Sequence, residues 1–197
     1  MGPRWYWCCG VGAVSGLLSA AAVIFFHWGD VGAPEVAGCC LGMRVSSRCG
    51  GVDATLYLLP GAIFGVLFGA MQKWSMRAAF GRICGFAAAS WVANALAVFL
   101  CVWLTDALGD LIQIDFLDLP MALAGAIAGM AGGVSLGFSA KALSLGINLR
   151  RSIIVATVLG LLVPLVLLWE VAGIFIFFVI WQAGYAAALA SSLPAET

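Results

Sequence analysis

Charge is scarce in this chain. Only 9% of its 197 residues are charged, and the 9 Lys and Arg residues balance the 9 Asp and Glu residues. So little charge beside 64% hydrophobic residues excludes an ordinary soluble domain. A net charge of zero, without any basic run, argues against a nucleic-acid partner. We therefore expect the lipid bilayer to surround the chain and predict an all-α integral membrane protein.

Side chains that serve in catalysis, metal binding or proton transfer are also few. The only histidine is His27, no Cys-x-x-Cys is present, and no charged residue falls in the middle of a predicted span. The predicted spans therefore lack the embedded charged residues that a proton-coupled pump or a voltage sensor uses. We expect no enzyme activity, no cofactor and no metal site.

Long apolar runs fill most of the sequence. Because a spanning helix needs about 20 apolar residues, the chain has room for roughly six spans in one bundle. The predicted spans, all within a single transmembrane domain over 1–197, are 8–27, 55–72, 79–103, 120–141, 152–169 and 171–191, with outer loops 28–54 and 104–119. Glu170 marks a turn between the last two spans, and five or seven spans stay open as alternatives.

The basic residues orient the bundle. With a cytoplasmic N-terminus, all of them except Arg44 and Arg48 fall on the cytoplasmic side, as the positive-inside rule requires. Both termini are then cytoplasmic. Abundant Ala and Gly, and more Arg than Lys, suggest a bacterium with GC-rich coding, and hence its inner membrane.

Glycine recurs at every fourth position on two predicted spans. Residues four apart on a helix differ by only about 40° in direction, so they form one face that another backbone can approach closely. The residues are Gly61, Gly65 and Gly69 on the second span, and Gly125, Gly129, Gly133 and Gly137 on the fourth. These faces favour close packing within the bundle, and a homo-oligomeric contact or a lined pathway is the alternative.

Residues 133–137 also read G-V-S-L-G, the pattern around a hydrolase nucleophile. A nucleophile elbow needs a strand before a sharp turn, and none is expected here. Six spans, a long first outer loop and Gly133-Val134-Ser135 on the fourth span are similar to the rhomboid intramembrane proteases. That resemblance implies a nucleophilic Ser135 and a histidine base on the sixth span, where this chain has Gln182. An amide cannot act as a general base, so the resemblance implies an inactive rhomboid-like protein.

Polar residues at bilayer depth form a short list. Ser90 and Asn94 are four apart, hence on one face of the third span, and Gln182 lies near the middle of the sixth. Such groups commonly hydrogen-bond across helices as structural glue. The functional alternative is a small polar pocket between the third and sixth spans, with the Pro164 break loosening the backbone nearby.

Four of the seven cysteines are predicted to face the outside. In an oxidising periplasm, Cys39 or Cys40 could bridge to Cys49, and the other could reach Cys101. The connectivity stays open, since sequence alone does not determine it.

Two classes of function follow. The first is a non-catalytic multi-pass protein, an assembly or accessory subunit of a membrane complex or a homo-oligomer, packed through its Gly-x-x-x-Gly faces. The second is a small-solute carrier, or the substrate-binding membrane subunit of a transporter, with Ser90, Asn94 and Gln182 as its site. An inactive rhomboid-like protein ranks below both.

Overall fold

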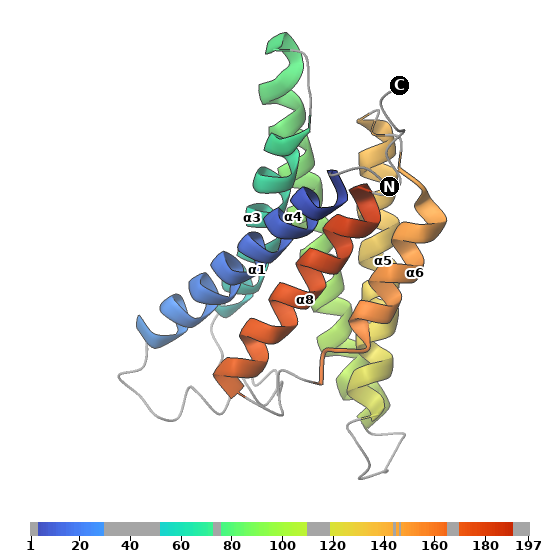
Figure 1. Ribbon diagram of the computed structural model, residues 1–197. Helices are drawn as coiled ribbons and strands as arrows, with labels where there is room; N and C mark the ends of the chain where they lie inside the picture. Colours follow the sequence, from blue (N-terminus) through green and yellow to red (C-terminus); the bar gives the residue numbers. More distant parts are fainter. Residues whose placement is uncertain are drawn as a thin grey trace.

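The computed structural model describes residues 4–29, 52–72, 76–109, 119–143, 145, 147–164 and 170–190. All regular structure in these residues is α-helical (Figure 1). The helices are α1 (Arg4–Gly29), α3 (Val52–Met71), α4 (Met76–Gly109), α5 (Leu119–Ala142), α6 (Leu149–Gly160) and α8 (Glu170–Ala190).

Four of these helices are long and apolar enough to cross a membrane. The apolar stretches are Tyr6–Phe25, Phe80–Thr105, Leu119–Ala142 and Ala172–Ala190, and Leu59–Met71 is a shorter one. Large apolar side chains, among them Phe25, Phe99 and Trp103, are exposed on the outside of the bundle. Lipid is the solvent in which such a surface is stable. The fold is that of an α-helical membrane protein.

The fifth predicted span, 152–169, differs from the observed helix. α6 ends at Gly160, and residues 161–164 form a turn. Pro164 has no N–H for the Gly160 carbonyl, which instead accepts a hydrogen bond from the Val163 N–H at 3.1 Å. The 12 residues of α6 cover only about 18 Å, less than the hydrocarbon thickness of about 30 Å. α4 differs in the other direction, because it continues to Gly109, into the predicted outer loop 104–119.

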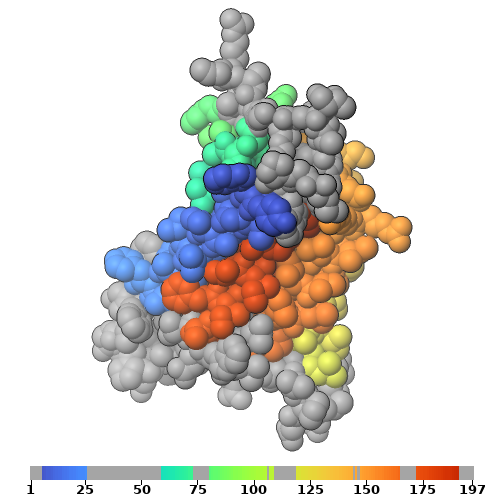
Figure 2. Space-filling model, in the orientation of Figure 1, coloured from blue at the N-terminus to red at the C-terminus, as the bar shows by residue number. Residues whose placement is uncertain are grey.

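The six described helices close into a ring. Each helix packs on the next one along the chain, and α8 packs on α1. Figure 2 shows one face of this ring, where α1 and α8 lie side by side. Aromatic side chains fill the interior: Phe64 stacks on Phe68 with ring centroids 5.5 Å apart, and Phe86 lies 5.7 Å from Phe68.

Glycine lets backbones touch at the contact between α1 and α8. A Cβ built on Gly12 would lie 2.5 Å from the Gln182 carbonyl oxygen, and one on Gly16 would lie 2.5 Å from the Phe178 carbonyl oxygen. No real side chain fits at such distances. The two helices therefore approach along their backbones, as small residues allow in membrane bundles.

α5 and α6 meet in the same way. A Cβ on Gly125 would collide with the Gly160 carbonyl oxygen, and one on Gly129 would collide with that of Ala156. Further along α5, a Cβ on Gly133 would lie 2.8 Å from the Ala156 Cβ, and one on Gly137 would lie 2.5 Å from Leu149 Cδ1.

α3 and α4 form the third such contact. A Cβ on Gly61 would lie 2.6 Å from the Asn94 Cβ, and one on Gly65 would lie 2.6 Å from the Ala87 Cα. Gly69 is different, because its Cβ would be 3.6 Å from the nearest atom, the Ile83 Cα, which is ordinary contact. We call α1–α8, α3–α4 and α5–α6 the tight pairs.

Between the tight pairs, two described glycines approach their neighbours less closely. A Cβ on Gly132 of α5 would have the Ala97 methyl of α4 as its nearest neighbour, at 3.2 Å. A Cβ on Gly184 of α8 would meet the Leu159 side chain of α6 at 3.3 Å. A Cβ on Gly132 would also lie 3.4 Å from the Ala93 carbonyl oxygen, so the shortest approaches at the described glycines lie inside the tight pairs.

Candidate binding pocket where the tight pairs meet

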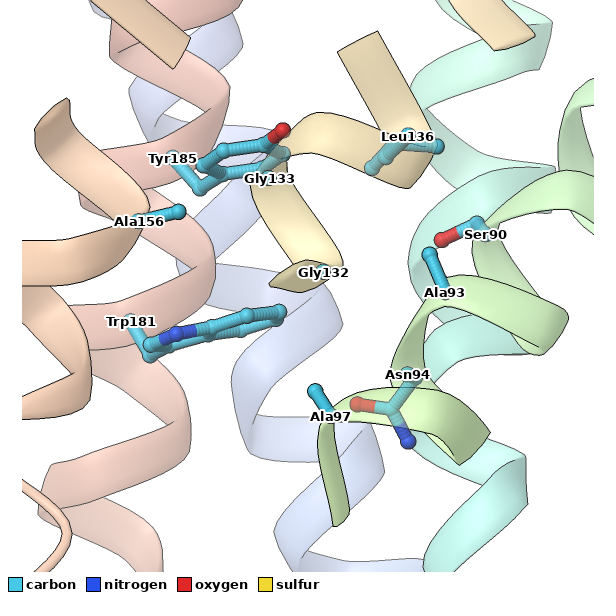
Figure 3. Close-up of a pocket in the computed structure, with 10 residues that line it drawn as sticks. All are labelled: Ser90, Ala93, Asn94, Ala97, Gly132, Gly133, Leu136, Ala156, Trp181 and Tyr185. Atoms are coloured by element: carbon cyan, nitrogen blue, oxygen red, sulfur yellow. The ribbon is translucent and has the colours of Figure 1, made fainter. Parts of the chain in front are cut away.

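A small pocket lies where the three tight pairs meet inside the ring (Figure 3). α4 of one pair, α5 and α6 of another, and α8 of the third supply its walls. The lining residues are Ser90, Ala93, Asn94, Ala97, Gly132, Gly133, Leu136, Ala156, Trp181 and Tyr185. In this conformation the pocket has room for about one water molecule.

The polar wall of the pocket comes from α4. Ser90 and Asn94 are buried one turn apart, and in Figure 3 the Ser90 hydroxyl and the Asn94 side-chain oxygen lie on the side of the cavity, whereas the Asn94 nitrogen points away from it. α3 packs behind them: a Cβ on Gly61 would lie 2.6 Å from the Ser90 carbonyl oxygen, and one on Gly65 would lie 2.9 Å from the Ser90 Cβ. The glycines of α3 thus allow close support of the turn that carries both polar groups.

The aromatic wall comes from α8. The Trp181 and Tyr185 rings stack with centroids 5.8 Å apart and planes inclined by 11°. Tyr185 also packs against Phe64 of α3, with centroids 6.0 Å apart. Its hydroxyl pairs with the Ser152 hydroxyl of α6 at 2.6 Å. Tyr185 is therefore held by contacts from two other helices.

Most of the other lining residues have small side chains or none. Gly132 and Gly133 present only backbone, and Ala156 adds one methyl group. Leu136 is the one large aliphatic side chain of the lining. The space between the polar and aromatic walls is thus bounded mainly by backbone and methyl groups.

Gln182 does not line this pocket. Its side-chain Nε2 donates to the Ser19 hydroxyl of α1 at 2.9 Å and to the Pro60 carbonyl of α3 at 3.4 Å. Its Oε1 is buried and has no hydrogen-bond partner among the described residues. The three polar residues predicted to share one site are therefore divided: Ser90 and Asn94 meet in the pocket, and Gln182 joins α8 to α1 and α3.

The two aromatic residues of the pocket, Trp181 and Tyr185, were not predicted from the sequence. A signal for Tyr185 was present, because a tyrosine at bilayer depth needs a partner for its hydroxyl. Trp181 carried a weaker signal, since it lies away from the helix ends, where membrane tryptophans gather.

The residues suggested by the rhomboid resemblance, Ser135 and Gln182, make contacts with different residues. Ser135 is partly exposed, is not part of the pocket lining, and accepts a hydrogen bond at its carbonyl from the Ser139 hydroxyl at 2.9 Å. Gln182 is engaged with Ser19 and Pro60.

The predicted disulfide residues fall into two groups. Cys39, Cys40 and Cys49 lie outside the described residues. Cys101 is a free, buried thiol that packs with Ala124 and Ala128 of α5. Its side chain lies on the face of α4 that contacts α5, and the bridge to Cys101 stays a prediction because its candidate partners are not among the described residues.

Comparison of the chain with protein-family models, curated proteins and solved structures finds no match. The pocket itself must therefore carry the functional argument.

Proposed function

We propose that the chain binds a small solute within the membrane, as a carrier or as the substrate-binding membrane subunit of a transporter. One observation carries this proposal. Ser90 and Asn94 line an interior pocket whose opposite wall is the stacked pair Trp181 and Tyr185. Solute sites commonly combine an apolar or aromatic surface with a few convergent polar groups.

The depth of these groups supports the proposal. Ser90 and Asn94 lie well inside the apolar stretch Phe80–Thr105. Polar side chains at such depth are costly against lipid and tend to face a bundle interior or a pathway. Both are buried, and Gly61 and Gly65 support their turn from behind.

A pocket for one water molecule must open before it admits a solute. Inside the tight pairs, glycines such as Gly16 and Gly129 bring the backbones of two helices close together, which leaves little freedom to slide. At the boundary between α6 and α8, Gly184 instead meets the Leu159 side chain, which can repack. Relative movement of packed helices is an established way to open and close such sites. We infer that opening moves the pair α1–α8 away from α4.

The assembly hypothesis draws less support from the glycine faces. Gly61, Gly65, Gly125 and Gly129 lie against helices of the same chain, so these faces are not available to a second copy. A protein partner would have to use the outward-facing apolar side chains. Such a partner fits the role of a substrate-binding subunit, because the partner would supply the energy for transport.

We also propose that both termini are cytoplasmic and that the protein resides in a bacterial inner membrane. The start of α1 and the end of α8 lie at the same end of the bundle as the end of α5 and the start of α6 (Figure 1). Lys141, Arg150 and Arg151 are exposed at that end. The positive-inside rule places this basic end in the cytoplasm.

Cysteine labelling tests the binding proposal. Asn94→Cys would be made in a chain whose seven native cysteines are replaced, and treated in membranes with a small water-soluble methanethiosulfonate reagent. Ala124→Cys is the matched control, because Ala124 is fully buried and lies outside the pocket lining. We expect Asn94→Cys to react several-fold faster. Equal, negligible reaction at both positions would contradict the proposed function.

A further inference from the structure

We propose that the outer face of the α5–α6 pair binds an anionic phospholipid, at the end of the bundle where α5 ends and α6 begins. Lys141 and Arg150 contact its headgroup, and Phe138 and Ile154 contact its acyl chains. None of these four residues lines the pocket, so the inference does not depend on the proposed binding of a solute.

Helix geometry places these residues on one side of the contact between α5 and α6. The two helices run antiparallel (Figure 1), and a Cβ on Gly137 of α5 would lie 2.5 Å from Leu149 Cδ1 of α6. Phe138 and Arg150 each come one residue later, a rotation of about 100° around the helix axis. In antiparallel helices this rotation turns both side chains to the same side of the contact. Lys141, rotated by about 40° from Gly137, is turned towards that side too.

This side of the α5–α6 pair faces the surroundings of the bundle. Phe138 is 57% exposed and Ile154 is 52% exposed, and both Lys141 and Arg150 are exposed as well. Phe138 precedes Lys141 by three residues, and Ile154 follows Arg150 by four, so each cation has an apolar neighbour one turn away on its own helix. In both cases the apolar residue lies nearer the middle of the helix pair. A phospholipid has the same order, with its charge outermost and its chains inside.

The positive charge at this end has no opposing charge within the described residues. The side chains of Lys141, Arg150 and Arg151 take part in no hydrogen bond or ion pair there. The sequence has no Asp or Glu from 119 to 169, a range that covers both helices and their connection. Basic residues close to a membrane surface attract anionic headgroups, and their N–H groups form strong hydrogen bonds with phosphate oxygens.

The connection between the two helices keeps the cations at headgroup depth. Lys141 lies in the last turn of the apolar stretch Leu119–Ala142. The Leu145 N–H donates to the Ala140 carbonyl at 3.0 Å, and the Leu145 side chain is buried in the core. The described part of the connection therefore folds back onto the bundle. Arg150 follows directly and stays near the end of the span, where hydrocarbon gives way to phosphate groups.

Native mass spectrometry of the purified full-length chain in mild detergent tests the proposal. The probes are palmitoyl-oleoyl phosphatidylglycerol, which has a net negative charge, and palmitoyl-oleoyl phosphatidylcholine, which has the same chains and no net charge. We expect the first phosphatidylglycerol to bind at least about tenfold more tightly than the first phosphatidylcholine, because it gains one or more full interactions with a cation. Equal affinity for the two lipids would overturn the proposal.

Glycerol phosphate separates a lipid from a free phosphate ester. It carries the phosphate group without acyl chains, so it lacks the contacts with Phe138 and Ile154. We expect it to bind at least about tenfold more weakly than phosphatidylglycerol, since burial of apolar chains is lost. Equal binding of glycerol phosphate would overturn the assignment to a lipid.

Two charge-matched pairs of variants locate the binding. Lys141→Gln with Arg150→Gln should bring the affinity for phosphatidylglycerol to within about threefold of that for phosphatidylcholine. Lys73→Gln with Arg77→Gln removes the same two charges from the connection between the second and third predicted spans, and should keep the tenfold preference. An equal loss in both pairs would overturn this face as the site, because any basic residue would then serve.

A single substitution covers the case in which the first pair does not fold. Arg150 is exposed, so Arg150→Gln should leave the unfolding temperature unchanged. It should lower the affinity for phosphatidylglycerol at least about threefold and leave that for phosphatidylcholine unchanged. An unchanged affinity for phosphatidylglycerol would contradict the proposal. The labelling of Asn94→Cys tests the proposed function separately.

Discussion

Gly125 and Gly160 face each other across the contact between α5 and α6, with only backbone between the helix axes. A Cβ on Gly125 would collide with the Gly160 carbonyl oxygen, and a Cβ on Gly160 would collide with the Gly125 carbonyl oxygen. Because the clash is reciprocal and involves backbone, no rotamer change can relieve it. This contact fixes α6 beside α5 at the point where the helix stops.

Gly125→Ala and Gly129→Ala should each destabilise the protein by about 1 to 3 kcal/mol, the usual cost of overpacking. Both new methyl groups would meet carbonyl oxygens of α6. Gly10→Ala and Gly81→Ala are matched controls, since a Cβ at either position has nothing within 4 Å. The controls should be neutral or slightly stabilising, because Ala favours helix over Gly. Thermal unfolding in detergent measures the difference.

Alanine substitutions of the three α3 glycines should differ in their effect on stability, although these glycines are evenly spaced four residues apart. Gly61→Ala and Gly65→Ala place a methyl group 2.6 Å from atoms of α4, whereas Gly69→Ala places it at 3.6 Å. We expect the first two substitutions to lower the unfolding temperature and the third to leave it unchanged. Equal effects at all three positions would show that the spacing, and not the distance, determines the cost.

The junction between Ser19 and Gln182 should respond asymmetrically to substitution. Ser19→Ala removes the 2.9 Å acceptor of Gln182 Nε2 but keeps the buried, unpartnered Oε1, and should cost about 1 to 2 kcal/mol. Gln182→Leu removes the hydrogen bonds and the unpartnered oxygen together, so it should cost less. The double variant should match Gln182→Leu. Chemical or thermal unfolding of the three variants checks this, and additive losses would argue against a direct interaction.

The membrane class and the helical content could be predicted because both follow from local composition. An apolar stretch such as Phe80–Thr105 admits few structures in lipid other than a helix. The end of α6 at Gly160 was harder to place. Pro164 predicts a break, but its exact position depends on the turn at residues 161–164 and on the contact with Gly125.

The candidate pocket could be predicted only in part, because direction around a helix axis matters more than depth. Ser90 and Asn94 share a face by their four-residue spacing and do lie in one pocket. Gln182 has a similar depth but points to α1, whereas its neighbour Trp181 points into the cavity. Which face of α8 meets α4 depends on the ring closure, which couples the first helix to the last.

Cys101 should be a free thiol in the purified protein. It is buried beside Ala124 and Ala128, and the Thr105 hydroxyl donates to its carbonyl at 2.7 Å. Unfolding in detergent with a maleimide reagent and no reductant should modify Cys101, and peptide mass spectrometry would identify it. Modification only after reduction would mean that Cys101 forms a disulfide.

The bond between Ser152 and Tyr185 should control how readily the pocket opens. It is a 2.6 Å hydroxyl contact between α6 and α8, across the boundary of two tight pairs. Tyr185→Phe removes it and keeps the aromatic ring that stacks on Trp181. We expect this substitution to raise the labelling rate of Asn94→Cys several-fold, because one closing interaction of about 1 kcal/mol is lost. Thr157→Val is the control, since that hydroxyl bonds only within α6, to the Ile153 carbonyl at 2.8 Å. An unchanged rate in Tyr185→Phe would place the opening movement elsewhere, between α4 and α5.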